Sequence, residues 1–176
     1  MKGFTLAETL IVIGITLVLS AIAVAYNHSS EGQVILYKDQ AVVVNFLNQA
    51  KYFTAQKYRD PSIPDYFACA FGLHFEPGLR EFVFFQDLAE GDCGSGSSNY
   101  RYDEGMDPSE TIEIFSLDSK LEFEGIPENG LDVFFIPPEV DASSSVGLPV
   151  SFVIKTMDGR FRATTTVVSG GQIITE

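Results

Sequence analysis

One carboxylate lies where the sequence otherwise carries no charge. Glu8 is the single charged residue between Phe4 and Ala25, a run of 22 residues dominated by Leu, Ile, Val and Ala. A carboxylate can form an ion pair, and inside an apolar helix it is costly unless it has a partner or another role. The sequence therefore predicts that Glu8 makes a specific contact.

The run around Glu8 predicts a membrane-spanning helix. At about 1.5 Å per residue it would be about 33 Å long, which is enough to cross a bilayer core of about 30 Å. A secretory signal peptide would have a shorter apolar region, and a plain signal anchor gives no reason for the acid. These two alternatives compete with a third interpretation, which comes from the residues at the amino end.

The amino end combines a short basic leader, a glycine followed by a phenylalanine, and one acid at a fixed place in an uncharged span. Residues 2–8, together with the apolar residues 9–15 that follow, resemble the prepilin leader of the type IV pilin and pseudopilin family. Ala25 departs from that family, because many major pilins have a proline there. The departure fits a minor subunit better than a principal one.

The resemblance implies processing and assembly roles for three residues. A prepilin peptidase would cut between Gly3 and Phe4, and the new amine of Phe4 would be methylated. Glu8 would pair with that amine on a neighbouring subunit, which would offset the desolvation of the acid and set the axial register. The implied partners are the prepilin peptidase, an inner-membrane assembly platform, other pilin or pseudopilin subunits and the lipid bilayer.

The rest of the chain is most like a GspH/FimT-type minor pseudopilin. This finer resemblance rests on element order and on three segments: an aromatic helix end at residues 50–53, Phe-rich strands at 71–75 and 84–87, and a hairpin at 158–161. It implies a pilin-like α+β fold, in which a long N-terminal helix packs on an antiparallel β-sheet head domain.

The charge distribution argues against nucleic-acid binding. The formal net charge is −13, and residues 60–141 contain nineteen Asp and Glu against three Lys and Arg. Such a chain repels phosphate backbones. Lys155, Arg160 and Arg162 supply a small basic patch on one predicted hairpin, and we expect no nucleic-acid partner.

Two cysteines fall in the domain that the resemblance places outside the cytoplasm, where a disulfide is permitted. A bond between Cys69 and Cys93 would tie the first strand to the loop of residues 91–98 and close about 25 residues, which stabilises by about 3 kcal/mol in the chain-entropy model. Two buried free thiols are the alternative. The spacing does not fit a zinc site or a CxxC redox centre.

Acidic residues also cluster in a predicted loop that could supply calcium ligands, with Asp103 and Asp107 as the candidates. The resemblance supports this idea, because some major pseudopilins bind calcium in a loop. The EF-hand pattern is absent, however, and a solvated acidic surface is the favoured interpretation. We therefore expect no cofactor, with calcium as the one exception to test.

Nothing in the sequence indicates an enzyme. The GxSxG, Walker, HExxH and dinucleotide fingerprints are absent. His28 and His74 are far apart, and a single histidine in a strand such as that of His74 is more often structural than a ligand or a base. We expect neither a catalytic residue nor a resident metal.

The predicted elements position these groups. Val43, Phe46, Leu47, Ala50 and Phe53 form a helical stripe within residues 34–58, while the polar stretch at 26–31 either continues the helix or breaks it, with Ser29 and Ser30 able to cap a restart. Prolines at 61 and 64 end the helix. Short runs rich in Phe, Val, Ile and Thr then predict antiparallel strands at 67–75, 81–86, 111–115, 120–124, 132–136, 150–156, 161–167 and 172–175.

The predicted organisation is a leader at 1–3, a transmembrane or filament-core helix at 4–25, an amphipathic half-helix at 26–60 and a β head domain at 61–176. The implied function is that of a structural subunit of a type IV pilus or a type II secretion-like filament. It would sit in the bacterial inner membrane by a single span, with its head outside the cytoplasm, before assembly into a cell-surface or periplasmic filament. The alternative is a membrane-anchored extracellular binding module that does not polymerise.

Overall fold

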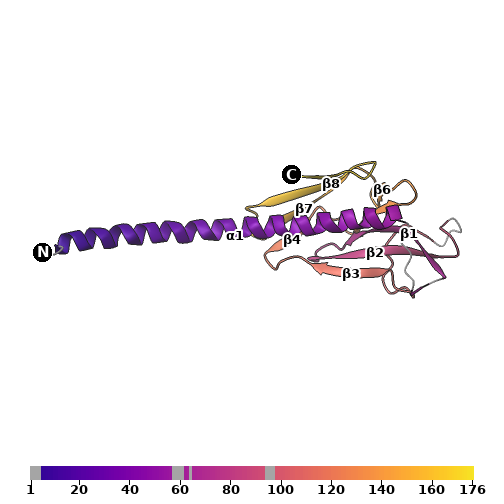
Figure 1. The fold of residues 1–176 in the computed structure, drawn as a ribbon, viewed down its shortest axis with the longest axis horizontal. Helices are drawn as coiled ribbons and strands as arrows, with labels where there is room; N and C mark the ends of the chain where they lie inside the picture. Colours follow the sequence, from indigo (N-terminus) through magenta and orange to yellow (C-terminus); the bar gives the residue numbers. More distant parts are fainter. Residues whose placement is uncertain (1–4, 57–61, 64, 94–97) are drawn as a thin grey trace.

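The computed structural model describes residues 5–56, 62–63, 65–93 and 98–176. One long helix leaves a β-rich head as a rod, so the N-terminal end lies far from the head (Figure 1). This arrangement confirms the coarse α+β class. The elements in the described residues are α1 (Leu6–Gln56), β1 (Tyr66–Phe75), β2 (Glu81–Glu90), β3 (Thr111–Ser116), β4 (Leu121–Glu124), β5 (Leu131–Ile136), β6 (Asp141–Ser144), β7 (Val150–Thr156), β8 (Arg162–Val167) and β9 (Ile173–Thr175).

The helix α1 runs for 51 residues without interruption. The polar stretch at 26–31 therefore continues the helix rather than breaking it. No proline occurs between Leu6 and Gln56, so the sequence does not force a break in the backbone hydrogen-bond ladder. The predicted helix end at Tyr58 lies outside the described residues.

The strands form two antiparallel sheets rather than one. The first has the order β3-β2-β1-β5-β6, and the second has the order β4-β7-β8-β9. Every predicted strand is present, although β2 extends to Glu90, beyond the predicted end at Gln86. The strand β6 was not predicted because its sequence, Asp-Ala-Ser-Ser, has low β propensity, and its pairing with β5 creates it.

The second half of α1 packs against the sheets. Leu36, Val43, Leu47 and Ala50 are at most 1% exposed, and Phe46 lies edge-on to Phe82, with ring centroids 5.4 Å apart. The predicted helical stripe is thus confirmed as the buried face. The helix contributes to one core with side chains from both sheets, so the packed half of α1 and the head fold as one unit.

Polar side chains of α1 fix its position along the strands. The Gln40 amide donates to the carbonyl of Thr164 at 3.0 Å, and the Lys51 ammonium donates to the carbonyl of Gly171 at 2.7 Å. The buried Asp39 carboxylate accepts a hydrogen bond from the backbone N–H of Asp118 at 2.7 Å. These bonds give the helix a specific register, which apolar contacts alone do not.

The strand β3 is present as predicted and exposes most of its side chains. Ile112 and Ile114 are 39% and 58% exposed, and Glu113 is exposed as well. The reason is that β3 is the edge of its sheet. Its Phe115 packs on the core, with the ring centroid 6.1 Å from that of Phe46 in α1. Ile114 instead contributes to a surface cavity, described below.

Two glycines have defined backbone roles. Gly159 has a φ of +70° in the turn between β7 and β8, which confirms the predicted hairpin. Gly72 lets β1 approach β5, because a Cβ atom there would lie 2.5 Å from the carbonyl oxygen of Val133. A side chain at position 72 would therefore force the two strands apart.

Candidate functional site

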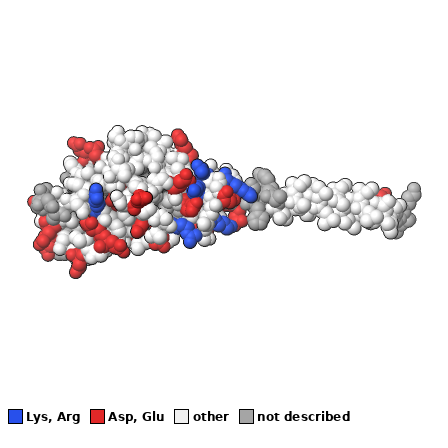
Figure 2. All heavy atoms as spheres, turned by 180° about the vertical axis from the view of Figure 1, so that it is seen from behind, with Lys and Arg blue, Asp and Glu red and all other residues white. Residues whose placement is uncertain are grey.

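The first part of α1 projects from the head and is not buried against it. Residues Leu6–Val24 form a helix that is long and apolar enough to span a membrane, and none of it is buried in this chain. Leu17, Val18 and Ile22 are each more than 60% exposed. Figure 2 shows this rod almost free of charge beside a head that carries many acidic side chains.

Glu8 belongs to a helix cap. Its carboxylate accepts hydrogen bonds from the backbone N–H and the hydroxyl of Thr5, each at 2.8 Å. The Glu8 backbone N–H in turn donates to the Thr5 hydroxyl at 3.3 Å. This reciprocal pair is a capping box, which satisfies N–H groups at the helix start. This cap was not predicted, although a Thr followed three residues later by a Glu is its usual signal.

The other two processing residues, Gly3 and Phe4, lie outside the described residues. The structure therefore places one of the three predicted residues, Glu8, at the free end of α1. In a single copy the Glu8 carboxylate has local donors from Thr5, so it is not left without hydrogen bonds in the apolar segment.

Cys69 and Cys93 are joined by a disulfide, with Cα atoms 5.3 Å apart. Cys69 lies in β1 and is 1% exposed, whereas Cys93 follows β2 at the start of the connection to β3. The bond thus ties that connection to the first sheet. Tyr100 and Tyr102, further along the connection, pack on a small cluster made by Ala70, Phe85 and Phe134.

Two buried carboxylates hold the same connection. Asp87 accepts hydrogen bonds from the Ser98 hydroxyl and from the backbone N–H of Tyr100. Glu110 accepts from the backbone N–H groups of Leu88 and Asp103, at 3.2 and 2.9 Å. Burial raises the pKa of Asp87, and it raises the pKa of Glu110 to about 7, because desolvation outweighs these hydrogen bonds.

The two calcium candidates have different surroundings. Asp103 accepts a hydrogen bond from the Asn99 side chain at 2.6 Å, whereas Asp107 is exposed and precedes a proline. In the part of the chain that the structure describes, no group of three or more His, Cys, Asp or Glu residues is arranged to hold a metal ion. The buried acids Asp87 and Glu110 instead bind backbone N–H groups of the connection.

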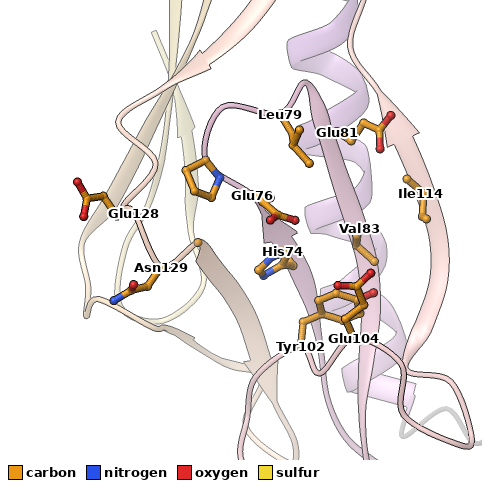
Figure 3. Close-up of a pocket in the computed structure, with 12 residues that line it drawn as sticks. His74, Glu76, Leu79, Glu81, Val83, Tyr102, Glu104, Ile114, Glu128 and Asn129 are labelled. Atoms are coloured by element: carbon orange, nitrogen blue, oxygen red, sulfur yellow. The ribbon is translucent and has the colours of Figure 1, made fainter.

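His74 has a close carboxylate partner that the sequence did not reveal. Its Nδ1 atom lies 2.7 Å from Oδ1 of Asp132 on the neighbouring strand β5, and the ring of Tyr102 packs on the imidazole with centroids 5.0 Å apart. Figure 3 shows His74 at the centre of a surface cavity.

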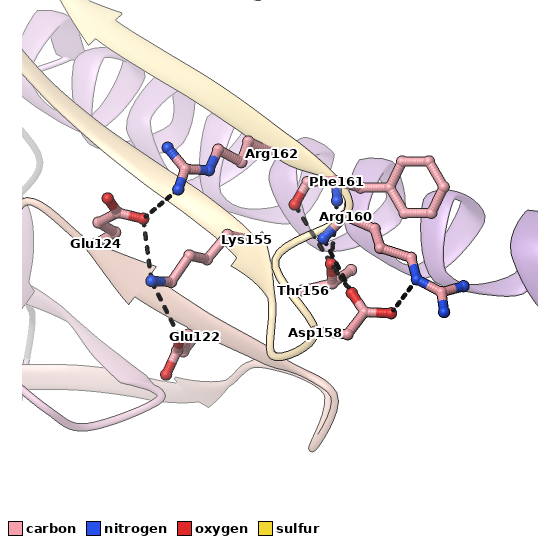
Figure 4. A network of polar contacts seen from close by, with 8 residues as sticks. All are labelled: Glu122, Glu124, Lys155, Thr156, Asp158, Arg160, Phe161 and Arg162. Atoms are coloured by element: carbon pink, nitrogen blue, oxygen red, sulfur yellow. Dashed lines mark hydrogen bonds and ion pairs between the residues drawn. The ribbon is translucent and has the colours of Figure 1, made fainter.

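The basic patch on the hairpin of β7 and β8 is neutralised by acids. Lys155 contacts Glu122 and Glu124 at 3.3 and 3.1 Å, and Arg162 lies 3.8 Å from Glu124 (Figure 4). Arg160 at the turn lies 3.3 Å from Asp158. These ion pairs reduce the attraction of the patch for a phosphate backbone.

Comparison with known proteins gives no relative, since no family model, no curated protein and no solved structure matches this chain.

Proposed function

We propose that the protein is a minor pilin or pseudopilin, a structural subunit of a type IV pilus or a type II secretion-like filament. It is held in a membrane by the N-terminal half of α1 and then assembled by packing of that helix against other subunits. The partners are other such subunits, a prepilin peptidase, an inner-membrane assembly platform and the bilayer, and the head lies outside the cytoplasm.

One observation carries the proposal. Residues Leu6–Val24 expose an apolar surface all round, and the same unbroken helix then enters the core of the head. Burial of apolar side chains is the main driving force of folding and association, so this segment needs either lipid or other helices around it. A helix that continues without a break into the head fits a subunit whose apolar segment is surrounded first by lipid and later by other helices.

The sequence pattern supports the same proposal. The glycine and phenylalanine at positions 3 and 4 precede the only acid of the apolar run. The capping box keeps the Glu8 carboxylate hydrogen-bonded in a single copy, which lowers the cost of holding it in an apolar environment. In a filament, the amine of a neighbouring Phe4 would offer that carboxylate a charged partner.

The N-terminal mass of the protein tests the processing step. We expect a chain that begins at methylated Phe4 in cells with a prepilin peptidase, and an uncleaved chain in cells without it. A chain that begins at Met1 in both strains would favour the anchored binding module, and one that begins near Tyr26 would identify a secreted protein.

Substitution of the acid tests assembly. Glu8→Gln removes the charge at the position proposed to meet the neighbouring amine, and we expect it to lower the amount of protein in sheared filaments while membrane anchoring persists. Glu31→Gln, an acid on the same helix beyond the apolar segment, is the matched control. Equal incorporation of both variants would contradict the assembly role of Glu8.

A further inference from the structure

A second cavity lies between α1 and the start of β3, and it shares no lining residue with the cavity at His74. Its volume is about 450 Å³, and its lining includes Gln49 and Phe53 of α1, Gln86 of β2 and Ile112 of β3. None of the described residues that line it is charged, although the net charge of the chain is −13. The cavity is therefore a neutral site on an acidic head.

Gln86 is the buried polar residue of this cavity. It is 4% exposed and lies two residues after Phe84, whose ring packs on that of Phe53, so strand alternation turns its side chain toward α1. Its backbone N–H donates to the carbonyl of Glu110 at 2.9 Å, but in the described part of the chain its carboxamide has no hydrogen-bond partner. A buried carboxamide without a partner is costly, which indicates that a ligand supplies one.

Gln49 provides a second carboxamide at the same cavity. It is half-buried, and among the described residues its side chain has no hydrogen-bond partner either. A carboxamide presents both a donor and an acceptor, so the complementary ligand is a neutral group that also has both. A charged ligand group would lose hydration without meeting an opposite charge, and an apolar one would leave Gln86 unpaired.

The outer edge of β3 shows how such a group can reach the cavity. Because β3 is the last strand of the first sheet, no described strand pairs with its outer edge (Figure 1). The register with β2 skips Ile112 between Thr111 and Glu113, so Ile112 is the extra residue of a β-bulge. Ile112 is 39% exposed and lines the cavity, so a strand added to β3 would pass beside the cavity.

We propose that this site binds an extended segment of another protein, which adds a strand to β3 and places an asparagine or glutamine side chain in the cavity. The carboxamide of the ligand would exchange hydrogen bonds with Gln86 and Gln49, and its backbone would pair with the edge of β3. The inference does not rest on the proposed filament, because the apolar N-terminal half of α1 takes no part in the site.

A peptide titration followed by NMR tests the recognition of the carboxamide. The full-length protein in zwitterionic micelles is titrated with acetyl-Thr-Val-Asn-Val-Thr-amide, and the matched control peptide has leucine in place of asparagine. We expect the asparagine peptide to shift the backbone amides of Thr111 and Ile112 and the side-chain amide of Gln86. The leucine peptide should bind at least about tenfold more weakly. Equal binding of both peptides, or no shift at these groups with either, would overturn the proposal.

A second pair of probes tests strand addition. One carries the asparagine peptide's sequence with both valine nitrogens methylated, and the other has both threonine nitrogens methylated. Backbone N–H groups of a strand alternate between its two edges, so each peptide is blocked along one edge only. We expect one of them to lose at least about tenfold in affinity and the other to bind as the parent peptide does. Equal binding of the two would contradict pairing with β3.

Variants of the protein locate the site. Gln86→Leu should abolish binding and leave the urea midpoint of unfolding unchanged or raised, since the group that it removes has no partner. Gln172→Leu, at an exposed position outside the cavity lining, is the matched control and should bind as the wild type does. Gln49→Leu alters the other carboxamide without touching the sheet, and it should weaken binding about fivefold. Wild-type affinity in both Gln86→Leu and Gln49→Leu would refute the cavity as the site.

Discussion

The two halves of α1 share one unbroken helix but have opposite surroundings. Residues Leu6–Val24, the exposed segment, bury nothing in this chain. Residues 36–56, the packed segment, carry Leu36, Val43 and Leu47, which are at most 1% exposed. The exposed segment is apolar on every side, whereas the packed segment has one apolar stripe and polar residues elsewhere.

The difference shows how the distribution of apolar residues around a helix decides what the helix packs against. A one-sided stripe matches a single sheet surface, so the packed segment completes its contacts inside its own chain. An apolar surface all round needs partners on every side, which this head cannot supply. The exposed segment thus depends on an environment outside the chain, and the packed segment depends on the head.

The largest expected effect compares truncations in the two segments. Leu47→Ala should destabilise the head by about 2–5 kcal/mol, since it opens a cavity in a fully buried site. Leu17→Ala removes the same atoms from the exposed segment and should change the free energy of unfolding by less than about 0.5 kcal/mol. Denaturant unfolding in micelles, followed by near-ultraviolet circular dichroism, measures both, and equal losses would contradict the comparison.

A charge placed in each segment gives the next largest effect. Val18→Lys should lower the partition of the full chain into lipid vesicles about a hundredfold, because a lysine in the centre of a span costs about 3 kcal/mol. Val34→Lys, also on an exposed face of α1, is the control and should partition as the wild type does. A vesicle flotation assay reads both, and a similar loss for Val34→Lys would move the membrane boundary into the second half of the helix.

The smallest expected effect concerns the head alone. Because the pKa of Glu110 is raised from 4.5 to about 7, the folded state holds a proton there that the unfolded state has released. Stability should therefore fall as pH rises from about 4.5 to about 7, by on the order of 2 kcal/mol, and then level off.

Glu110→Gln cannot titrate, and its unfolding free energy should vary less over that pH range. The variant loses one acceptor for the two backbone N–H groups, so we expect it to be less stable than the wild type at pH 4.5. Denaturation curves at several pH values measure both effects. An unchanged pH dependence in the variant would exclude Glu110 as the titrating group.

Much of the fold followed from local pattern. The helical stripe, the two prolines after it and the Asp158-Gly159 turn each predict their element from neighbouring residues, and the structure contains the stripe and the turn. The strand β6 and the place of β3 at the edge of the first sheet could not be predicted in this way. Both depend on which strands lie side by side.

The candidate site residues divide in the same way. Thr5 and Glu8 are three residues apart, so the capping box could have been predicted from the sequence, although it was not. The partner of His74 is 58 residues away, and the connection held by Asp87 and Glu110 folds back over the sheet. Residue spacing along the sequence does not predict such contacts, because they depend on which strands lie side by side in the sheet.

The sequence by itself determined the apolar surface of the first half of α1, the one acid in it and the short strand-forming runs of the head. These features depend on residue type and short spacing, which set transfer free energies and local backbone preferences. Only the tertiary structure decided that α1 is one unbroken rod, that Cys69 meets Cys93 and that residues of β1, β2 and β3 line one surface cavity. Each of those outcomes joins residues distant along the chain, and the packing of two sheets against one helix brings them together.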